Sequence, residues 1–198
     1  GFTVVDGVLV CYKGIAKDVI VPEGVTELGK YVFQGCAYME TLTLPEGLIK
    51  LGDGAINSCN SLRSIKFPDS LSDIGTDSLS FNKSLECLDI PVNVTRIRQN
   101  AVRFNDSMTR LNVYCNLNLT GIAFVSLNNL SEIHFYGVIE NISNLNFTCM
   151  PCLSKVVFYN TVLSLGGEEE KNFDAPFAFN AKLTTVEFRD TVIALGGK

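Results

Sequence analysis

Prolines recur at a constant interval through the first half of the chain, and this interval constrains the fold more than any other feature. They occupy positions 22, 45, 68 and 91, a constant step of 23. In the same register the position is continued by Tyr114, Tyr136, Tyr159 and Arg189, so that successive steps along the chain are 23, 23, 23, 23, 22, 23 and 30. We assign the seven extra positions of the last unit to an insertion at residues 168–174. A period of this size indicates a repeat protein.

Apolar residues keep fixed offsets from this landmark position (residues 22, 45, 68, 91, 114, 136, 159 and 189). The column three residues before it contains Leu42, Ile65, Leu88, Leu111, Ile133, Val156 and Val186. The column one residue before it contains Leu44, Phe67, Ile90, Val113, Phe135, Phe158 and Phe188. Further apolar columns lie six and twelve residues before it and three residues after it.

The spacing of these columns predicts the architecture of one unit. Offsets of three and one differ by two, so both side chains point to the same face of a strand. The column at twelve is often preceded by a small residue, as in Ala55-Ile56, and this pair predicts a short helical turn under the strand. One unit cannot close a core, so the units must stack. We therefore predict an α/β repeat fold, a right-handed solenoid with a parallel sheet on one face.

The pattern Leu-x-x-Ile-x-Ile-Pro-x-x-Val-x-x-Ile, with Ala-Phe-x-x-Cys between, resembles the BspA-like leucine-rich repeats. The unit from Glu46 to Pro68 carries family residues at Leu48, Leu51, Ala55, Ile56, Cys59, Leu62, Ile65, Phe67 and Pro68. The resemblance extends over about residues 19–198 and is weakest between Tyr114 and Tyr159. It implies a leucine-rich repeat solenoid from a bacterium or protist, often at the cell surface, with roles in adhesion and protein binding.

The N-terminal segment at residues 1–18 does not follow the repeat. Residues 2–5 and 8–12 are apolar and β-branched, and Asp6-Gly7 separates them, which predicts a β-hairpin on a type I′ turn. The hairpin would cover the open edge of the first coil. We therefore divide the chain into a hairpin cap at residues 1–18 and a solenoid at residues 19–198. The solenoid contains about seven units and a partial eighth.

Two of the seven cysteines share a repeat column. Cys36 and Cys59 lie nine residues before the landmark position, and Asn82, Asn105 and Asn180 occupy the same column further on. Cysteine and asparagine are both small and both able to hydrogen-bond a nearby carbonyl, so we interpret the column as structural. We expect most of the cysteines to be free thiols.

Cys149 and Cys152 form a CxxC, which suits either a redox pair or half of a zinc site. Zinc takes about four ligands, and the sequence has no second CxxC or CxxH.

The acidic insertion at residues 168–174 could bind calcium, but it lacks the alternating Asp/Asn pattern of a known loop, so a solvated loop is the simpler interpretation. We expect neither a metal nor a cofactor.

The sequence contains no motif that indicates an enzyme. There is no GxSxG, P-loop, GxGxxG or HExxH. His134, the one histidine, alternates with Glu132 on a strand and is expected to face outward, where it lacks the cleft that acid–base catalysis requires. We predict a protein that is not an enzyme.

Seven asparagines head an N-x-Ser/Thr sequon, at positions 82, 93, 105, 118, 129, 141 and 146. Such an excess fits a glycosylated surface protein of a eukaryote. It fits equally a repeat that uses asparagine and threonine near its turns.

The outward columns of the predicted sheet vary from unit to unit, which is typical of a binding module. The row formed by Tyr114, Tyr136 and Tyr159 begins where the proline column ends, and at least two of the three rings should be exposed and adjacent. Our candidate binding residues on this face are Tyr114, Tyr136, Tyr159, Arg110, Glu132, His134 and Lys155. Rings with polar flanks suit a protein surface or the stacking of sugars. Alternatively, the tyrosines only replace the bulk of proline.

Composition argues against two classes of function, nucleic-acid binding and membrane spanning. A net charge of −5 and a pI near 4.9 argue against a nucleic-acid partner, and no apolar run approaches the ~20 residues of a membrane-spanning helix. We predict an extracellular or cell-surface module, with the cytoplasm as the alternative, that binds a protein or glycan as a monomer. The alternative function is a structural spacer within a longer repeat array.

Overall fold

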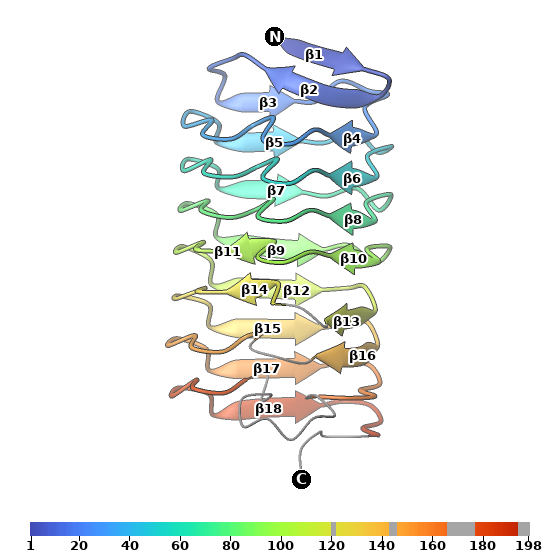
Figure 1. The fold of residues 1–198 in the computed structure, drawn as a ribbon. Helices are drawn as coiled ribbons and strands as arrows, with labels where there is room; N and C mark the ends of the chain where they lie inside the picture. Colours follow the sequence, from blue (N-terminus) through green and yellow to red (C-terminus); the bar gives the residue numbers. More distant parts are fainter. Residues whose placement is uncertain (120–121, 143–145, 166–176, 194–198) are drawn as a thin grey trace.

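The computed structural model is a solenoid of stacked coils in which each coil adds one strand to the same face (Figure 1). The structure describes residues 1–119, 122–142, 146–165 and 177–193, so the insertion at residues 168–174 and the end of the partial eighth unit lie outside the described residues. Eight strands form the column that we call the main face: β3 (Asp18–Ile20), β5 (Thr41–Thr43), β7 (Ser64–Lys66), β9 (Cys87–Ile90), β12 (Arg110–Val113), β15 (Glu132–Phe135), β17 (Lys155–Phe158) and β18 (Thr185–Phe188). They are hydrogen-bonded as a sheet of three followed by a sheet of five.

The pairing of the main-face strands confirms the repeat register. All pairs are parallel, and residues of the column three before the landmark lie opposite one another. The partners are Leu42 and Ile65, Leu111 and Ile133, and Val156 and Val186. Their sequence numbers differ by 23, 22 and 30, which are the steps of the units concerned. Units of different length therefore place their strands in the same register.

The core is built from the predicted apolar columns. Leu111, Ile133 and Val156 are fully buried, and so are Phe135 and Phe158 in the column one residue before the landmark. The rings of these two phenylalanines stack at 4.9 Å between centroids. Burying one such side chain stabilises the fold by about 1.5–3 kcal/mol, and a stacked coil on either side is what makes the burial possible.

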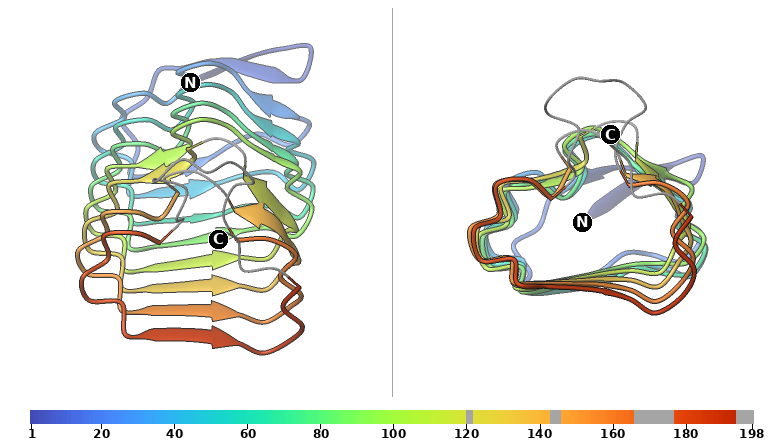
Figure 2. Two further views of the ribbon diagram at one scale, coloured as in Figure 1. Left: turned by 60° about the horizontal axis from the view of Figure 1, so that its bottom comes forward. Right: turned by 90° about the horizontal axis from the view of Figure 1, so that it is seen from below.

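Shorter strands line the other sides of the coils (Figure 2). The second sheet contains β4 (Glu27–Leu28), β6 (Lys50–Leu51), β8 (Asp73–Ile74) and β10 (Arg96–Ile97). Two further pairs are β11 (Val102–Arg103) with β14 (Phe124–Val125) and β13 (Leu117–Leu119) with β16 (Ile139–Ile142). In the end-on view the coils superimpose, and the main-face strands form the long lower side (Figure 2).

The predicted N-terminal hairpin is present. Strands β1 (Phe2–Val5) and β2 (Val8–Tyr12) pair antiparallel, and Asp6 and Gly7 both have positive φ, 51° and 78°, as a type I′ turn requires. The second hairpin strand also pairs in parallel with β4. The hairpin therefore covers the edge of the second sheet, where unpaired backbone groups would otherwise face solvent.

The predicted helical turns are wrong, because the described residues contain no helix. Ala55 and Ile56 lie in a tight turn between Gly54 and Ser58, whose φ angles of 61° and 60° interrupt any helix. The amide of Ile56 donates to Ser78 in the next coil at 2.8 Å instead of to its own turn. Positive φ recurs ten residues before the landmark in Gly35, Ser58, Phe81, Phe104, Ser126, Cys149 and Phe179.

Candidate binding surface

The three tyrosines of the landmark column form one continuous stack at the edge of the main face. The ring centroids of Tyr114 and Tyr136 are 4.6 Å apart with an interplanar angle of 8°, and those of Tyr136 and Tyr159 are 4.4 Å apart at 10°. This spacing is that of adjacent strands, so the backbone itself sets the stack. Burial, and then the neighbouring phenols, raise the pKa of Tyr136.

The switch from proline to tyrosine lengthens the hydrogen-bonded strands. The tyrosine amides donate to the carbonyl one residue before the landmark in the preceding coil, as in Tyr136 to Val113 at 2.8 Å. Proline has no amide hydrogen for this bond. Strands β9, β12 and β15, which are followed by a coil with a tyrosine at the landmark, accordingly extend to the residue before their own landmark. Strands β5 and β7, which are followed by a coil with a proline there, end two residues before it.

An arginine closes one end of the stack. The guanidinium carbon of Arg189 lies 4.6 Å from the ring centroid of Tyr159, and its Nη2 is 3.0 Å from Glu187 Oε2. The hydrogen bond from Arg189 is the main cause of the lowered pKa of the Glu187 carboxyl. Arg189 is absent from the candidate residues of the sequence analysis, although its place in the landmark column after three tyrosines was a usable signal.

The polar residues predicted to flank the stack are in part joined to it. A ring nitrogen of His134 lies 3.3 Å from the hydroxyl of Tyr159, and the other lies 3.1 Å from Glu132 Oε2. Lys155 pairs with Glu187 at 3.4 Å. Val157, in the same outward column as His134, is fully buried, which shows that side chains on the main face pack closely here.

Exposure along the stack is lower than predicted for two of the rings. Tyr114 is 39% exposed, whereas Tyr136 and Tyr159 are half-buried because each is covered on both ring faces. The predicted row is therefore adjacent, but Tyr114 is its most exposed ring and the other two are only partly open to solvent. Arg110, on the same face, is exposed and forms no ion pair with a described residue.

A groove begins at the open end of the stack. Its volume is about 390 Å³, within the ~300–1,000 Å³ of small-ligand sites. The landmark column changes here from proline to tyrosine, and the larger Tyr114 ring forms one wall beside Pro91. The groove is lined by Ile65, Lys66, Phe67, Asp69, Asp89, Pro91, Val92 and Tyr114. Of the lining residues only Tyr114 was predicted from the sequence, although the change from proline to tyrosine in the landmark column is visible there.

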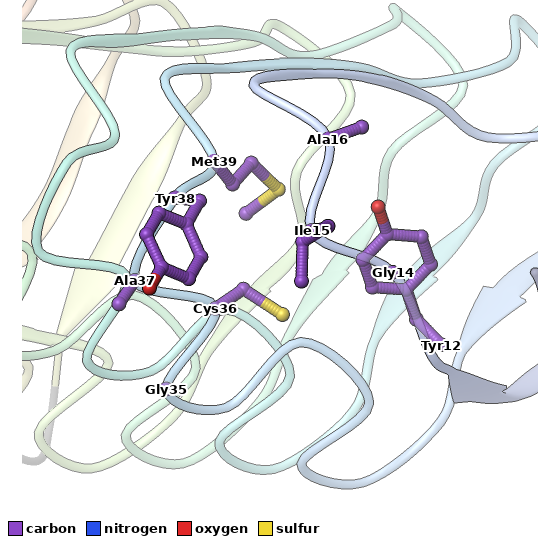
Figure 3. A pocket seen from close by; sticks show the side chains of 9 residues that line it. All are labelled: Tyr12, Gly14, Ile15, Ala16, Gly35, Cys36, Ala37, Tyr38 and Met39. Atoms are coloured by element: carbon purple, nitrogen blue, oxygen red, sulfur yellow. The ribbon is translucent and has the colours of Figure 1, made fainter.

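A second hollow, of about 210 Å³, lies where the hairpin cap joins the first coils. Figure 3 shows the side chains of Ile15, Cys36 and Met39 turned toward it. No charged side chain lines it, and burial raises the pKa of the Cys36 thiol. We interpret this hollow as the join between cap and solenoid.

The column shared by cysteine and asparagine has the predicted structural role. Cys59 Sγ donates to the carbonyl of Phe33 at 3.1 Å, and Asn82 Nδ2 donates to that of Ile56 at 2.9 Å. Asn82 Oδ1 also accepts from the amide of Cys59 at 2.8 Å, so one side chain joins two coils.

Three sequon asparagines belong to such ladders. Asn82, Asn105 and Asn146 are fully buried and accept backbone amides of the preceding coil, so no glycan can attach to them in the folded protein. Asn93, Asn118 and Asn129 are exposed.

All seven cysteines are free thiols in the structure, Cys149 and Cys152 included. Among the described residues no cluster of three or more His, Cys, Asp or Glu side chains is suited to hold a metal ion. Nor does that part of the chain contain a helix of sufficient length and apolarity to span a membrane.

Short coils of near-constant length that stack their strands in parallel place the chain among the solenoid repeat proteins. A family model described as the BspA type leucine rich repeat region matches residues 10–122 and 117–175, with six copies. The chain belongs to this BspA-type leucine-rich repeat family. A sequence comparison with curated proteins finds no significant match.

Two solved structures of similar fold are bacterial proteins. The pneumococcal vaccine antigen PcpA is 26% identical with a TM-score of 0.71, over 77% of this chain and 39% of that one. The leucine rich repeat protein of T. pallidum is 23% identical with a TM-score of 0.50, over 66% of this chain and 78% of that one. The present chain thus spans about two-fifths of the length of PcpA.

Proposed function

We propose that the protein is a non-catalytic binding module of a cell-surface protein, and that it binds through the main face around the tyrosine stack. The observation that supports this most directly is the groove beside Tyr114, where an ordered aromatic wall meets side chains of both charges. Aromatic residues with a polar rim are typical of interfaces. The rigid stack loses little conformational entropy on binding, which favours affinity.

The variation of the outward columns supports the same function. Thr43, Lys66, Asp89, Asn112 and His134 follow one another on identical backbone positions. A scaffold that keeps its core columns and varies its surface can recognise a partner without any change of fold.

Adhesion and a surface location are part of the proposal. PcpA is described as a vaccine antigen, and an antigen of that kind has to be reachable by antibodies. The candidate residues Arg110, Glu132, His134 and Lys155 would contact or orient a protein or glycan partner beside the three tyrosines.

The test is a screen of the purified protein on arrays of extracellular proteins and glycans. A Tyr114→Ala, Tyr136→Ala double variant should lose the specific interactions and keep the fold by circular dichroism. Tyr38→Ala is the matched control, because Tyr38 is 66% exposed in a loop away from the stack. If the double variant keeps the interactions, or if the unchanged protein binds nothing on the arrays, the structural spacer is favoured instead.

A further inference from the structure

The tyrosine stack ends differently on its two sides. At the Tyr159 end, the next coil supplies Arg189 at the landmark position and Glu187 two residues before it. The guanidinium covers the ring while the carboxylate holds the guanidinium. Such an arrangement combines a cation–π contact with a charge-assisted hydrogen bond.

At the Tyr114 end the carboxylate is present but the guanidinium is missing. Asp89 occupies the same repeat position as Glu187, two residues before the landmark, and Pro91 stands where Arg189 stands at the other end. Asp89 lies close enough to Tyr114 to help raise its pKa, after burial as the larger cause. Asn112 Nδ2 donates to Asp89 Oδ1 at 2.7 Å, which orients the carboxylate.

The space left by the missing cation is the groove itself. Asp69 and Asp89 contribute two carboxylates to its lining and Lys66 one ammonium group. Neither carboxylate forms an ion pair with a described residue. The groove therefore carries an excess of negative charge on a protein whose net charge is −5.

We propose that the groove receives an arginine side chain of a partner protein, which packs against Tyr114 where its ring lines the groove and pairs with Asp89. The inference rests on the proposed binding function and names the chemistry of its partner. The planar guanidinium matches both the ring and the carboxylate, as Arg189 does within this chain. A lysine ammonium offers the charge without the flat surface, so it should bind less well.

The probe is the peptide acetyl-Gly-Arg-Gly-amide at millimolar concentration, followed by the aromatic NMR signals of the ¹³C-tyrosine-labelled protein. We expect the Tyr114 ring signals to shift on titration while those of Tyr38 stay in place. The matched peptides replace arginine by lysine or by glutamine. Because a lysine ammonium lacks the planar surface and the paired donors of a guanidinium, its dissociation constant should be about two- to fivefold higher, and glutamine should give no saturable shift.

Two variants locate the site independently. Asp89→Asn keeps the shape of the side chain and should abolish most of the arginine-induced shift. Pro91→Arg should abolish it by placing a guanidinium on Tyr114 from within the chain. Thermal unfolding checks that both variants are folded.

Shifts of equal size in the Pro91→Arg variant, or equal binding of the arginine and glutamine peptides, would overturn the inference. So would a saturable shift of Tyr114 by methyl glucoside or N-acetylglucosamine without one by the arginine peptide. None of these three results contradicts the binding module, because that proposal depends on the array interactions and their loss in the tyrosine double variant.

Discussion

The amide of Tyr114 donates a hydrogen bond of 2.9 Å to the carbonyl oxygen of Ile90. The landmark residue one coil earlier, Pro91, has no amide hydrogen for the equivalent bond. The same substitution in the repeat thus changes two things together, the length of the main-face ladder and the presence of an aromatic ring at its edge. The stack and the groove both begin at this point.

Pro91→Tyr should stabilise the protein by roughly 1 kcal/mol. The new residue gains one hydrogen bond, about 1 kcal/mol net, and one stacked ring pair, about 0.5–1.5 kcal/mol. Against this, losing proline restores about 0.4–1 kcal/mol of unfolded-state entropy. Urea denaturation measures the difference. Pro68→Tyr is the control, because its neighbour at position 91 is proline and no ring pair forms; equal gains in both variants would show that stacking contributes nothing.

Phe135→Ala should destabilise the protein by about 3–5 kcal/mol, because it empties a fully buried site shared by neighbouring coils. The ring also packs edge-on against Phe147 at 5.6 Å. Lys66→Ala, at an exposed position of the main face, should cost less than about 0.5 kcal/mol. Chemical denaturation compares the two, and similar costs would contradict the assignment of inward and outward columns.

Asn105→Ala should cost about 2–6 kcal/mol. It leaves the amide of Asn82 and the carbonyl of Leu79 without their partner, at about 1–3 kcal/mol each. Asn118→Ala is the matched control, because Asn118 heads an exposed sequon and should cost less than about 0.5 kcal/mol. Equal unfolding free energies for the two variants would show that the asparagine ladder does not contribute to stability.

Stability should fall as the pH rises above 9. Burial raises the pKa of Cys59 to about 12 and that of Cys115 to about 11, from 9.0. Their contribution is therefore complete below pH 9 and is lost as the pH approaches the folded-state values, because the unfolded chain releases these protons first. The slope is at most about 1.4 kcal/mol per pH unit for each thiol. Denaturation at several pH values should show that the unfolding free energy of Cys59→Ala falls less steeply with pH than that of the unchanged protein. An unchanged slope would contradict the assignment of this pH dependence to the Cys59 thiol.

Regular offsets made most of this fold predictable. The core columns, the parallel register and the hydrogen-bonding role of the Cys36 and Asn82 column all follow from residues that recur at a fixed distance. The helical turns could not be excluded, because the backbone angle that prevents them is carried by Phe81 and Phe104 as well as by Gly35. A non-glycine residue gives no sign in the sequence that its φ is positive.

The site was predictable only in part. The tyrosine row follows from the repeat, but its exposure depends on how the rings cover one another, which a one-dimensional pattern does not contain. The groove depends on a contrast between neighbouring residues, Pro91 and Tyr114, rather than on any residue type. Because Pro91 and Tyr114 break the repeat instead of continuing it, recurring offsets in the sequence do not mark this position.

The parallel pairing of Lys155 with Thr185, across the longest unit of the array, has a consequence for engineering. Its strands pair in the same register as those of the shorter units, so the pairing does not depend on how many residues separate two strands. The seven extra residues of this unit thus leave the neighbouring strands in register, so we expect a foreign epitope or reporter peptide spliced in at the insertion to leave the proposed binding surface in place.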